Sequence, residues 1–280
     1  MTEPFGAYPL TPLQQWIRAL AHRLPANYFG RKAASLLLGP AGGRARRPLD
    51  VEIFGGQKAR LHPFDNICEK RVFATPQLWD PRERALLGAA ISARNSGTFA
   101  FVDVGANVGL YTLFARAEAA RAGVRLVAVC VEADAEMTAR LRFNLAASGA
   151  TDGVMIFACA ASDKEGEVSF AVDRNSRGLS RVDPTGGALV PARGLAAILA
   201  EAGLDHVDAM KIDIEGHEFA ALDAFFRNAP AALHPRLIIL ETSHTDEEQR
   251  PEALLRRHGY RCTLQTVRNA AFVRDGQTPG

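Results

Sequence analysis

Residues 99–132 read FAFVDVGANVGLYTLFARAEAARAGVRLVAVCVE, and this stretch decides the fold class. A short apolar run ends at Asp103, a helical pattern follows and closes at Gly123, and a second apolar run begins directly after it. Both runs are apolar throughout rather than alternating, which is typical of parallel strands covered on both faces. The stretch therefore predicts a β-α-β unit of an α/β protein.

The alternation of strands and helices continues toward the C-terminus. Expected helices cover 135–148, 192–203 and 218–228, and expected strands cover 154–162, 207–213 and 236–243. The segment 254–275 reads as a helix and two strands joined by a turn at Arg268-Asn269, which is too short for a parallel crossover. We predict a Rossmann-like, doubly wound, mostly parallel sheet of seven strands that ends in an antiparallel hairpin.

The first 80 residues follow a different pattern. Thr11, Pro12 and Gln14 form the signature of a helix start. Apolar residues then recur on one helical face: Leu13, Trp16, Ile17, Leu20 and Leu24. We expect this face to dock against the body of the protein rather than against a membrane.

A second helix over Ala33–Leu38 and a hairpin turn at Gly55-Gly56 follow, and Asp80 is the predicted cap of the next helix. The chain therefore divides into an N-terminal extension and a main domain. Residues 1–80 form the extension of helices and a β-hairpin, a candidate cap or dimerisation element. Residues 81–280 form the α/β domain.

The overall charge balance argues against a nucleic-acid partner, because 33 basic residues face 31 acidic ones. The charge is nevertheless uneven, since residues 18–60 hold nine Lys and Arg against Asp50 and Glu52. Such a basic stretch suits a phosphate, an anionic lipid surface or an acidic substrate. A solvated surface on an Arg-rich protein is the ordinary alternative.

Cysteine spacing and the N-terminal sequence set the expected compartment. The four cysteines are widely scattered, without zinc spacing or a disulfide framework, and a reducing compartment suits them. No signal-peptide pattern opens the chain, and no apolar stretch reaches the length of a membrane span. We therefore expect a cytoplasmic protein with no integral membrane segment.

The loop DVGANVG, residues 103–109, follows the first strand of the alternating set, where an α/β sheet binds its ligand. Asn107 stands where the G-x-G-x-x-G dinucleotide pattern has its second glycine, so that pattern is not met. Glu132 ends the next strand, in a position to accept hydrogen bonds from ribose hydroxyls. The D-x-G-x-N-x-G pattern favours S-adenosylmethionine over a dinucleotide, and a glycine-rich turn without a ligand is the remaining alternative.

Five blocks of the sequence resemble successive blocks of the FkbM-type methyltransferases: FVDVGANVG, VEADAEMTARLRFNLAAS, ACAASDKEGEVSF, MKIDIEGHEFAALDAF and LIILETSH. The likeness runs roughly from Phe99 to Val273, and KIDIEGHE, residues 211–218, is its most specific part. The resemblance implies a class I methyltransferase that uses S-adenosylmethionine and releases S-adenosylhomocysteine. It further implies O-methylation of a hydroxyl of a sugar, a glycan or a secondary metabolite.

The resemblance also implies a cofactor site. Asp103 and Gly105 would line the methionine end of the cofactor, Glu132 would hold the ribose, and Ala133 would lie beside the adenine. The loop that follows the third strand, which includes Ala161, would contact the edge of the adenine ring. The full set of expected cofactor-binding residues is Asp103, Gly105, Ala106, Asn107, Gly109, Glu132, Ala133, Ala161, Ser162, Asp163 and Asp213.

Methyl transfer to a hydroxyl needs an aligned acceptor oxygen and a group that takes its proton. Candidates lie at the ends of the fourth and fifth strands: Asp213, His217, Glu241 and His244. Asp213 ranks first as the base because its position is the most certain. We expect Lys211 to pair with a neighbouring acid, and Arg177, Ser180 and Glu215 are the candidate acceptor-binding residues.

Two alternatives remain at this stage. Asp213, Glu241 and His244 could hold Mg²⁺, which would lower the pKa of the acceptor hydroxyl, although strand-end acids need no metal to be useful. The chain could also be an NAD(P)-dependent oxidoreductase or a non-catalytic, methyltransferase-like partner subunit. The expected partner is a small-molecule or glycan hydroxyl acceptor, and a homodimer is a candidate assembly.

Overall fold

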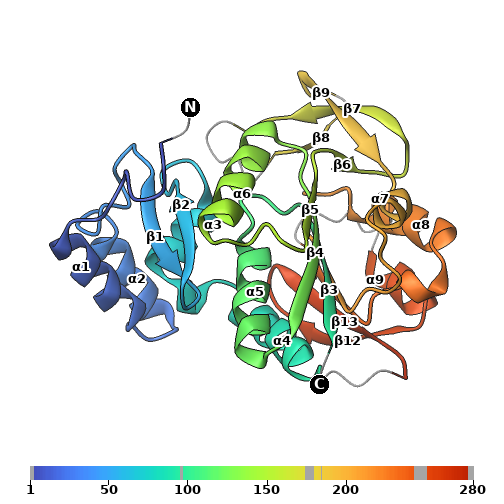
Figure 1. The fold of residues 1–280 in the computed structure, drawn as a ribbon, viewed down its shortest axis with the longest axis horizontal. Helices are drawn as coiled ribbons and strands as arrows, with labels where there is room; N and C mark the ends of the chain where they lie inside the picture. The colour runs from blue at the N-terminus through green and yellow to red at the C-terminus, as the bar shows by residue number, and fades with distance from the viewer. Residues whose placement is uncertain (1–2, 95–96, 174–179, 184, 243–250, 277–280) are drawn as a thin grey trace.

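The computed structural model describes residues 3–94, 97–173, 180–183, 185–242 and 251–276. Its centre is a seven-stranded sheet with the strand order β12-β13-β11-β10-β3-β4-β5 (Figure 1). The strands are β3 Thr98–Val104, β4 Arg125–Val131, β5 Val154–Phe157, β10 Ala209–Ile212, β11 Leu237–Glu241, β12 Tyr260–Gln265 and β13 Asn269–Arg274. The first five of these pair in parallel, and β13 is antiparallel to both of its neighbours. The predicted fold class and the antiparallel hairpin are confirmed.

Helices cover both faces of this sheet (Figure 1). One face carries α4 Pro81–Ser92, α5 Leu110–Ala122 and α6 Ala135–Ala147, and the other carries α7 Leu195–Glu201, α8 Glu218–Asn228 and α9 Pro251–Arg257. Alternate residues of β3 enter different cores, with Phe101 in the first and Val102 in the second. A strand buried on both faces needs apolar side chains at every position, which explains the continuous apolar runs.

A second, four-stranded sheet was not predicted. It has the order β6-β9-β7-β8, with β6 Ala160–Ala161, β7 Gly166–Ala171, β8 Arg181–Val182 and β9 Ala188–Arg193. The expected single strand over 154–162 is therefore wrong, because the chain leaves β4 after Phe157 and Ala160 pairs with Ala192 of β9 instead. The expected helix over 192–203 begins later for the same reason, since its first residues belong to β9.

The N-terminal extension contains α1 Pro12–His22, α2 Tyr28–Leu37, β1 Leu49–Ile53, β2 Gln57–Leu61, α3 Ile67–Ala74 and a 3₁₀ turn, η1 Pro76–Leu78. The predicted capping box of α1 and the β1–β2 hairpin are confirmed. The helix α2 begins earlier than expected because the Asn27 side chain caps it, and α3 was not predicted. Side chains from Leu49 and Phe73 join the same core as Leu113 of α5, so the extension and the main domain share one apolar interior.

Two expectations for the extension are wrong, the first of them in part, since Ile17 of the predicted docking face does pack against the core. Leu13 and Trp16 are 65% and 64% exposed, because α1 packs on α3 through its opposite side, where Arg18 and His22 hydrogen-bond to the carbonyl oxygen of Phe73. Asp80 precedes α4 but does not cap it, since its backbone is left-handed (φ 41°) and its carboxylate accepts no hydrogen bond from the helix. None of the described helices combines the length and the apolar character that crossing a bilayer requires.

Candidate active site

A cavity of about 310 Å³ opens at the carboxyl ends of β3, β4, β10 and β11. Its wall combines residues of the main domain with residues of the N-terminal extension. Six carboxyl side chains and three cationic ones line it: Asp80, Asp103, Glu132, Asp213, Glu215, Glu241, Arg71, Lys211 and Arg268. This concentration of ionisable groups at strand ends marks the cavity as the candidate active site.

The loop after β3 shapes the floor of the cavity. The backbone N–H groups of Gly105 and Ala106 donate to the carbonyl oxygen of Val131, at 2.9 and 3.0 Å. Gly105 is left-handed (φ +73°), and a Cβ atom there would lie 1.8 Å from the carbonyl oxygen of Asp213. Only glycine permits this approach, so the loop brings the ends of β3, β4 and β10 together.

Glu132, directly after β4, is held by the backbone at the edge of the cavity. Its two carboxylate oxygens accept hydrogen bonds from the N–H groups of Asn107 (2.7 Å) and Asp134 (2.8 Å). Burial raises the pKa of Glu132 to about 7, although these N–H groups pull it down. Each carboxylate oxygen has a second lone pair for a ligand hydroxyl, so Glu132 is a preorganised acceptor of hydrogen bonds.

Asp103 is 1% exposed and also lines the cavity. The hydroxyl of Thr112 donates to its Oδ2 at 2.7 Å, which fixes the side chain. Burial raises the pKa of Asp103, and the positive charge of Lys211 opposes this rise. The site therefore contains a buried acid whose charge depends on a neighbouring cation.

Lys211 is the central cation of the site. Its Nζ lies 2.7 Å from Oδ2 of Asp213 and 4.9 Å from the centre of the Tyr111 ring. Burial opposes its charge, but the carboxylates of Asp213 and Asp103 outweigh burial and raise the pKa of the ammonium. The predicted pairing of Lys211 with a neighbouring acid is confirmed, and this pair fixes Asp213 beside the cavity.

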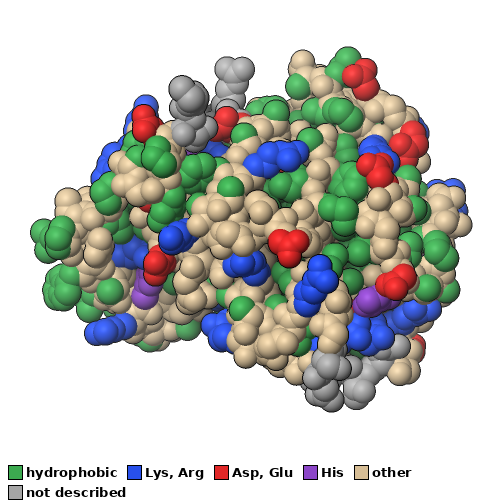
Figure 2. All heavy atoms as spheres, in the orientation of Figure 1, with side chains coloured by type: hydrophobic (Ala, Val, Ile, Leu, Met, Phe, Trp, Pro, Cys, Tyr) green, Lys and Arg blue, Asp and Glu red, His purple; other side chains and the backbone are tan. Residues whose placement is uncertain are grey.

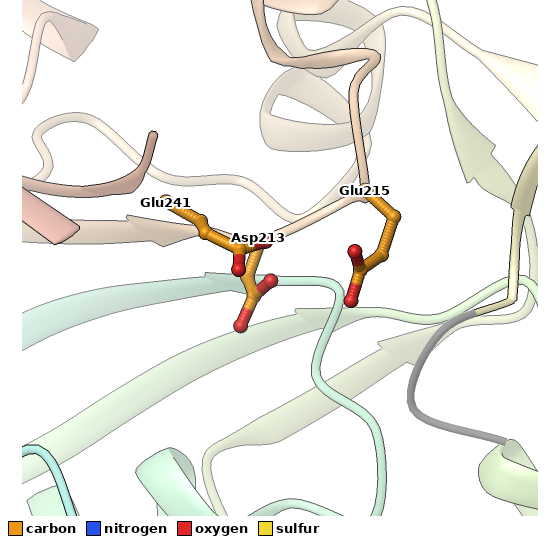
Figure 3. A group of neighbouring side chains, drawn as sticks. All are labelled: Asp213, Glu215 and Glu241. Atoms are coloured by element: carbon orange, nitrogen blue, oxygen red, sulfur yellow. The ribbon is translucent and has the colours of Figure 1, made fainter. Parts of the chain in front are cut away.

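Three carboxylates meet where β10 and β11 end (Figure 3). One oxygen from each of Asp213, Glu215 and Glu241 lies within 4.8 Å of the others, an arrangement that a divalent cation could join. Asp213 and Glu241 belong to the predicted set and Glu215 is an addition to it, whereas the predicted His244 lies outside the described residues. Glu218 holds the loop in place by accepting hydrogen bonds from the N–H groups of Ile214 and Gly216, each at 3.0 Å.

Burial, followed by repulsion from Asp213 and Glu218, raises the pKa of Glu215 to about 7. Between pH 4.5 and about 7, Glu215 therefore keeps its proton in the folded protein but releases it in the unfolded chain. The folded state loses stability as the pH rises through this range. We expect Glu215→Gln to have a higher free energy of unfolding than wild type at pH 8. This difference between variant and wild type should be about 1–2 kcal/mol larger at pH 8 than at pH 5.

Urea unfolding at both pH values measures this difference. The matched control is Glu167→Gln, at the exposed start of β7, which should show no such dependence. A stability difference between Glu215→Gln and wild type that is the same at both pH values would contradict the expectation.

The other predicted residues divide into two groups. Ala106, Asn107, Ala133, Ala161 and Ser180 line the cavity. Gly109, Ser162, Asp163 and His217 do not, and Nε2 of His217 lies 3.4 Å from Oγ of Ser162 and 3.9 Å from Oδ1 of Asp163. The structure thus groups His217 with the loop after β6 rather than with Asp213. Arg177, like His244, is outside the described residues.

The N-terminal extension contributes site residues that were not predicted. Cys68, Arg71, Trp79 and Asp80 line the cavity, although their sequence carries no recognisable motif. Asp80 accepts a hydrogen bond from the hydroxyl of Tyr111 at 3.1 Å, and burial raises its pKa. Its left-handed backbone could not be anticipated, because the sequence DPRE reads as an ordinary helix start.

Asn66, the cap of α3, connects the extension to the cofactor loop. Its Oδ1 accepts from the N–H groups of Cys68 and Glu69, and its Nδ2 donates to Oδ1 of Asn107 at 2.8 Å. Asn107 itself is left-handed (φ 52°). The loop DVGANVG is therefore supported from the extension as well as from the sheet.

Comparison with known proteins adds a family to this geometry. A family model, described as methyltransferase FkbM domain, matches residues 103–262, which is more than half of the 280-residue chain. None of the curated proteins matches the sequence significantly.

Among solved structures, methyltransferase FkbM from Methylobacillus flagellatus KT is 17% identical, with a TM-score of 0.48 and coverage of 92% of this chain. The present chain spans 57% of the length of that protein. Precorrin-6y C5,15-methyltransferase from Geobacter metallireducens GS-15 is 14% identical, with a TM-score of 0.43 and coverage of 74% of this chain and 92% of the other. The family assignment rests on the family model. The chain belongs to the FkbM methyltransferases, a family of S-adenosylmethionine-dependent enzymes.

Proposed function

We propose that this protein transfers a methyl group from S-adenosylmethionine to a hydroxyl oxygen of a sugar, a glycan or a secondary metabolite. One observation carries the proposal: the preorganised acceptor Glu132 and the Lys211–Asp213 pair face the same cavity from the ends of β4 and β10, the two strands that flank β3. Glu132 suits a cofactor with a ribose, because its carboxylate can accept hydrogen bonds from the ribose hydroxyls. The Lys211–Asp213 pair suits a reaction in which the acceptor hydroxyl loses its proton.

The residues around β3 and β4 fit the cofactor. Glu132 can accept from two ribose hydroxyls, and the missing Cβ of Gly105 lets the loop after β3 lie directly against the backbone of Asp213. Asp103 offers a buried carboxylate for the ammonium group of the methionine part, and Ala133 and Ala161 leave room for the adenine. We propose that Gly109, Ser162 and Asp163 support these contacts from behind, since they do not line the cavity. The bound cofactor supplies a methyl group activated by a sulfonium.

Asp213 is the proposed base. The ammonium of Lys211 stabilises its ionised form and holds one of its oxygens, so the carboxylate is oriented before the acceptor arrives. When the new carbon–oxygen bond forms, the proton of the acceptor hydroxyl passes to Asp213. His217 lies away from this point, and Glu241 and Glu215 are placed to accept hydrogen bonds from further hydroxyls, which favours a polyhydroxylated acceptor such as a sugar.

The metal question has a direct test. Lys211 already compensates the charge of Asp213, so we expect methyl transfer to continue after treatment with EDTA, at a rate within about twofold of the untreated enzyme. Activity that EDTA abolishes and Mg²⁺ restores would instead assign a divalent cation to Asp213, Glu215 and Glu241.

Calorimetry tests the proposed cofactor. We expect the protein to bind S-adenosylhomocysteine with a Kd on the order of 1–100 μM and to show no heat with NADPH. Binding of NADPH without any response to S-adenosylhomocysteine would establish the oxidoreductase alternative and exclude the proposed reaction.

We further propose that residues 1–80 cap the acceptor end of the cavity, because Cys68, Arg71 and Trp79 form part of its wall. The four cysteines are free thiols, which supports a reducing, cytoplasmic compartment.

A further inference from the structure

The helices α1 and α2 expose an unusual amount of apolar surface. Ten large hydrophobic residues are exposed in the described structure, and six of them belong to the 24-residue segment 13–36, which spans nearly all of this helix pair. They are Leu13, Trp16, Leu20, Tyr28, Phe29 and Leu36. Figure 2 shows hydrophobic side chains standing out at the edge of the molecule formed by these helices. Clustered exposure of this kind indicates a binding surface rather than scattered surface residues.

The six residues form one stripe on each helix. Leu13, Trp16 and Leu20 are spaced by three and four residues on α1, and Tyr28, Phe29 and Leu36 share one side of α2. The opposite side of α1 is engaged with the protein, through Ala21 and the hydrogen bonds of Arg18 and His22 to Phe73. The exposed stripes are therefore outward faces of helices that are fixed from behind.

The charge of the same segment is entirely positive. Residues 4–49 contain no Asp or Glu and seven basic residues: Arg18, Arg23, Arg31, Lys32, Arg44, Arg46 and Arg47. Five of the seven are exposed, and in the described part of the chain these five pair with no carboxylate. Lys32 lies over the ring of Tyr28 at 4.9 Å, so positive charge adjoins the apolar stripe directly.

We propose that α1 and α2 bind the surface of a bilayer that contains anionic lipids. Apolar and aromatic side chains on one face, surrounded by Lys and Arg, are the composition that enters the interface between headgroups and acyl chains. A second copy of the chain is disfavoured as the occupant, because a twofold contact through this face would oppose two surfaces of the same positive charge. The helix pair packs on α3, which carries Cys68 and Arg71 of the cavity wall, so the proposed membrane contact lies one helix away from the active site.

Tryptophan fluorescence offers a clean test, because the chain has only two tryptophans. Trp16 is 64% exposed, whereas Trp79 is 3% exposed in the core. We expect vesicles of about 30% phosphatidylglycerol in phosphatidylcholine to shift the emission to shorter wavelength, and pure phosphatidylcholine vesicles to leave it unchanged. In Trp16→Phe the shift should disappear.

Sedimentation with the same vesicles measures the bound fraction of wild type and of matched variants. Leu13→Gln combined with Phe29→Gln should lower the bound fraction at least fivefold, as should Arg31→Gln combined with Lys32→Gln or a rise to about 0.5 M salt. The control is Leu189→Gln, since Leu189 is 67% exposed on β9, outside the helix pair, and should bind like wild type. Calorimetry with S-adenosylhomocysteine verifies that each variant is folded.

Three results would overturn the proposal. One is an unchanged tryptophan emission spectrum with anionic vesicles, which would exclude the bilayer as the partner and favour an acidic protein instead. Another is equal binding to neutral vesicles. The third is a dimer in analytical ultracentrifugation that Leu13→Gln dissociates, because the second copy would then be the occupant.

Discussion

Asp213→Asn is expected to lower kcat for methyl transfer by a factor of about 10² to 10⁴, while the Kd of S-adenosylhomocysteine changes by less than about threefold. Asparagine keeps the shape of the side chain and its contact with Lys211, but an amide cannot take the proton of the acceptor hydroxyl. The measurement is the release of S-adenosylhomocysteine in the presence of an acceptor that wild type methylates.

The matched control is Asp223→Asn on α8, where the aspartate forms an exposed ion pair with Arg227 at 2.9 Å. This variant should retain wild-type kcat, because surface ion pairs contribute little. If Asp213→Asn kept its activity, the base would have to be another group, with Glu215 and Glu241, whose carboxylates meet that of Asp213, as the first candidates. If it lost cofactor binding instead, Asp213 would be a cofactor ligand and not a base.

Gly105→Ala is expected to lower the free energy of unfolding by about 3 kcal/mol or more, equivalent to a Tm lower by roughly 6–12 °C. The new Cβ would overlap the carbonyl oxygen of Asp213, so either the loop after β3 or the end of β10 must move. We therefore also expect S-adenosylhomocysteine to bind at least about tenfold more weakly. Thermal unfolding and calorimetry measure the two effects.

Gly203→Ala is the control that separates the two costs of Gly105→Ala, namely the clash of the new Cβ with Asp213 and the strain of a left-handed backbone. Gly203 has a similar left-handed φ of +67°, but a Cβ there meets no atom within 4 Å. Its substitution should cost only about 1 kcal/mol and leave cofactor binding intact. Equal destabilisation by the two variants would show that the close approach between Gly105 and Asp213 does not matter.

Several features of the site follow from local sequence. The position of Gly105 after a buried strand predicts a turn, and its left-handed φ agrees with this. The acid at position 132 was predicted to lie at the carboxyl edge of the sheet, where the structure has it. Lys211 could be assigned a carboxylate partner because a lysine in a buried strand needs one. Each of these inferences depends on a few neighbouring residues only.

The errors arose where distant segments decide the local structure. The run 154–162 is apolar enough for one strand, but β9 draws its last residues into a second sheet. Asp80 has the sequence context of a helix cap, but the hydroxyl of Tyr111 binds its carboxylate instead. Leu13 and Trp16 have the spacing of a buried face, and only the packing of α1 on α3 shows which side remains exposed.

The sequence alone determined the alternation of strands and helices in the central sheet, its parallel character and the family, because periodicity, glycine positions and the block KIDIEGHE are properties of short contiguous segments. The tertiary structure decided the surroundings of Asp213. It brought Glu215 and Glu241 to the same point, and it completed the cavity with Arg71 and Asp80 of the extension. The physical reason is that burial and the electric field at a side chain are set by whichever segments pack against it, however far away they are in the sequence.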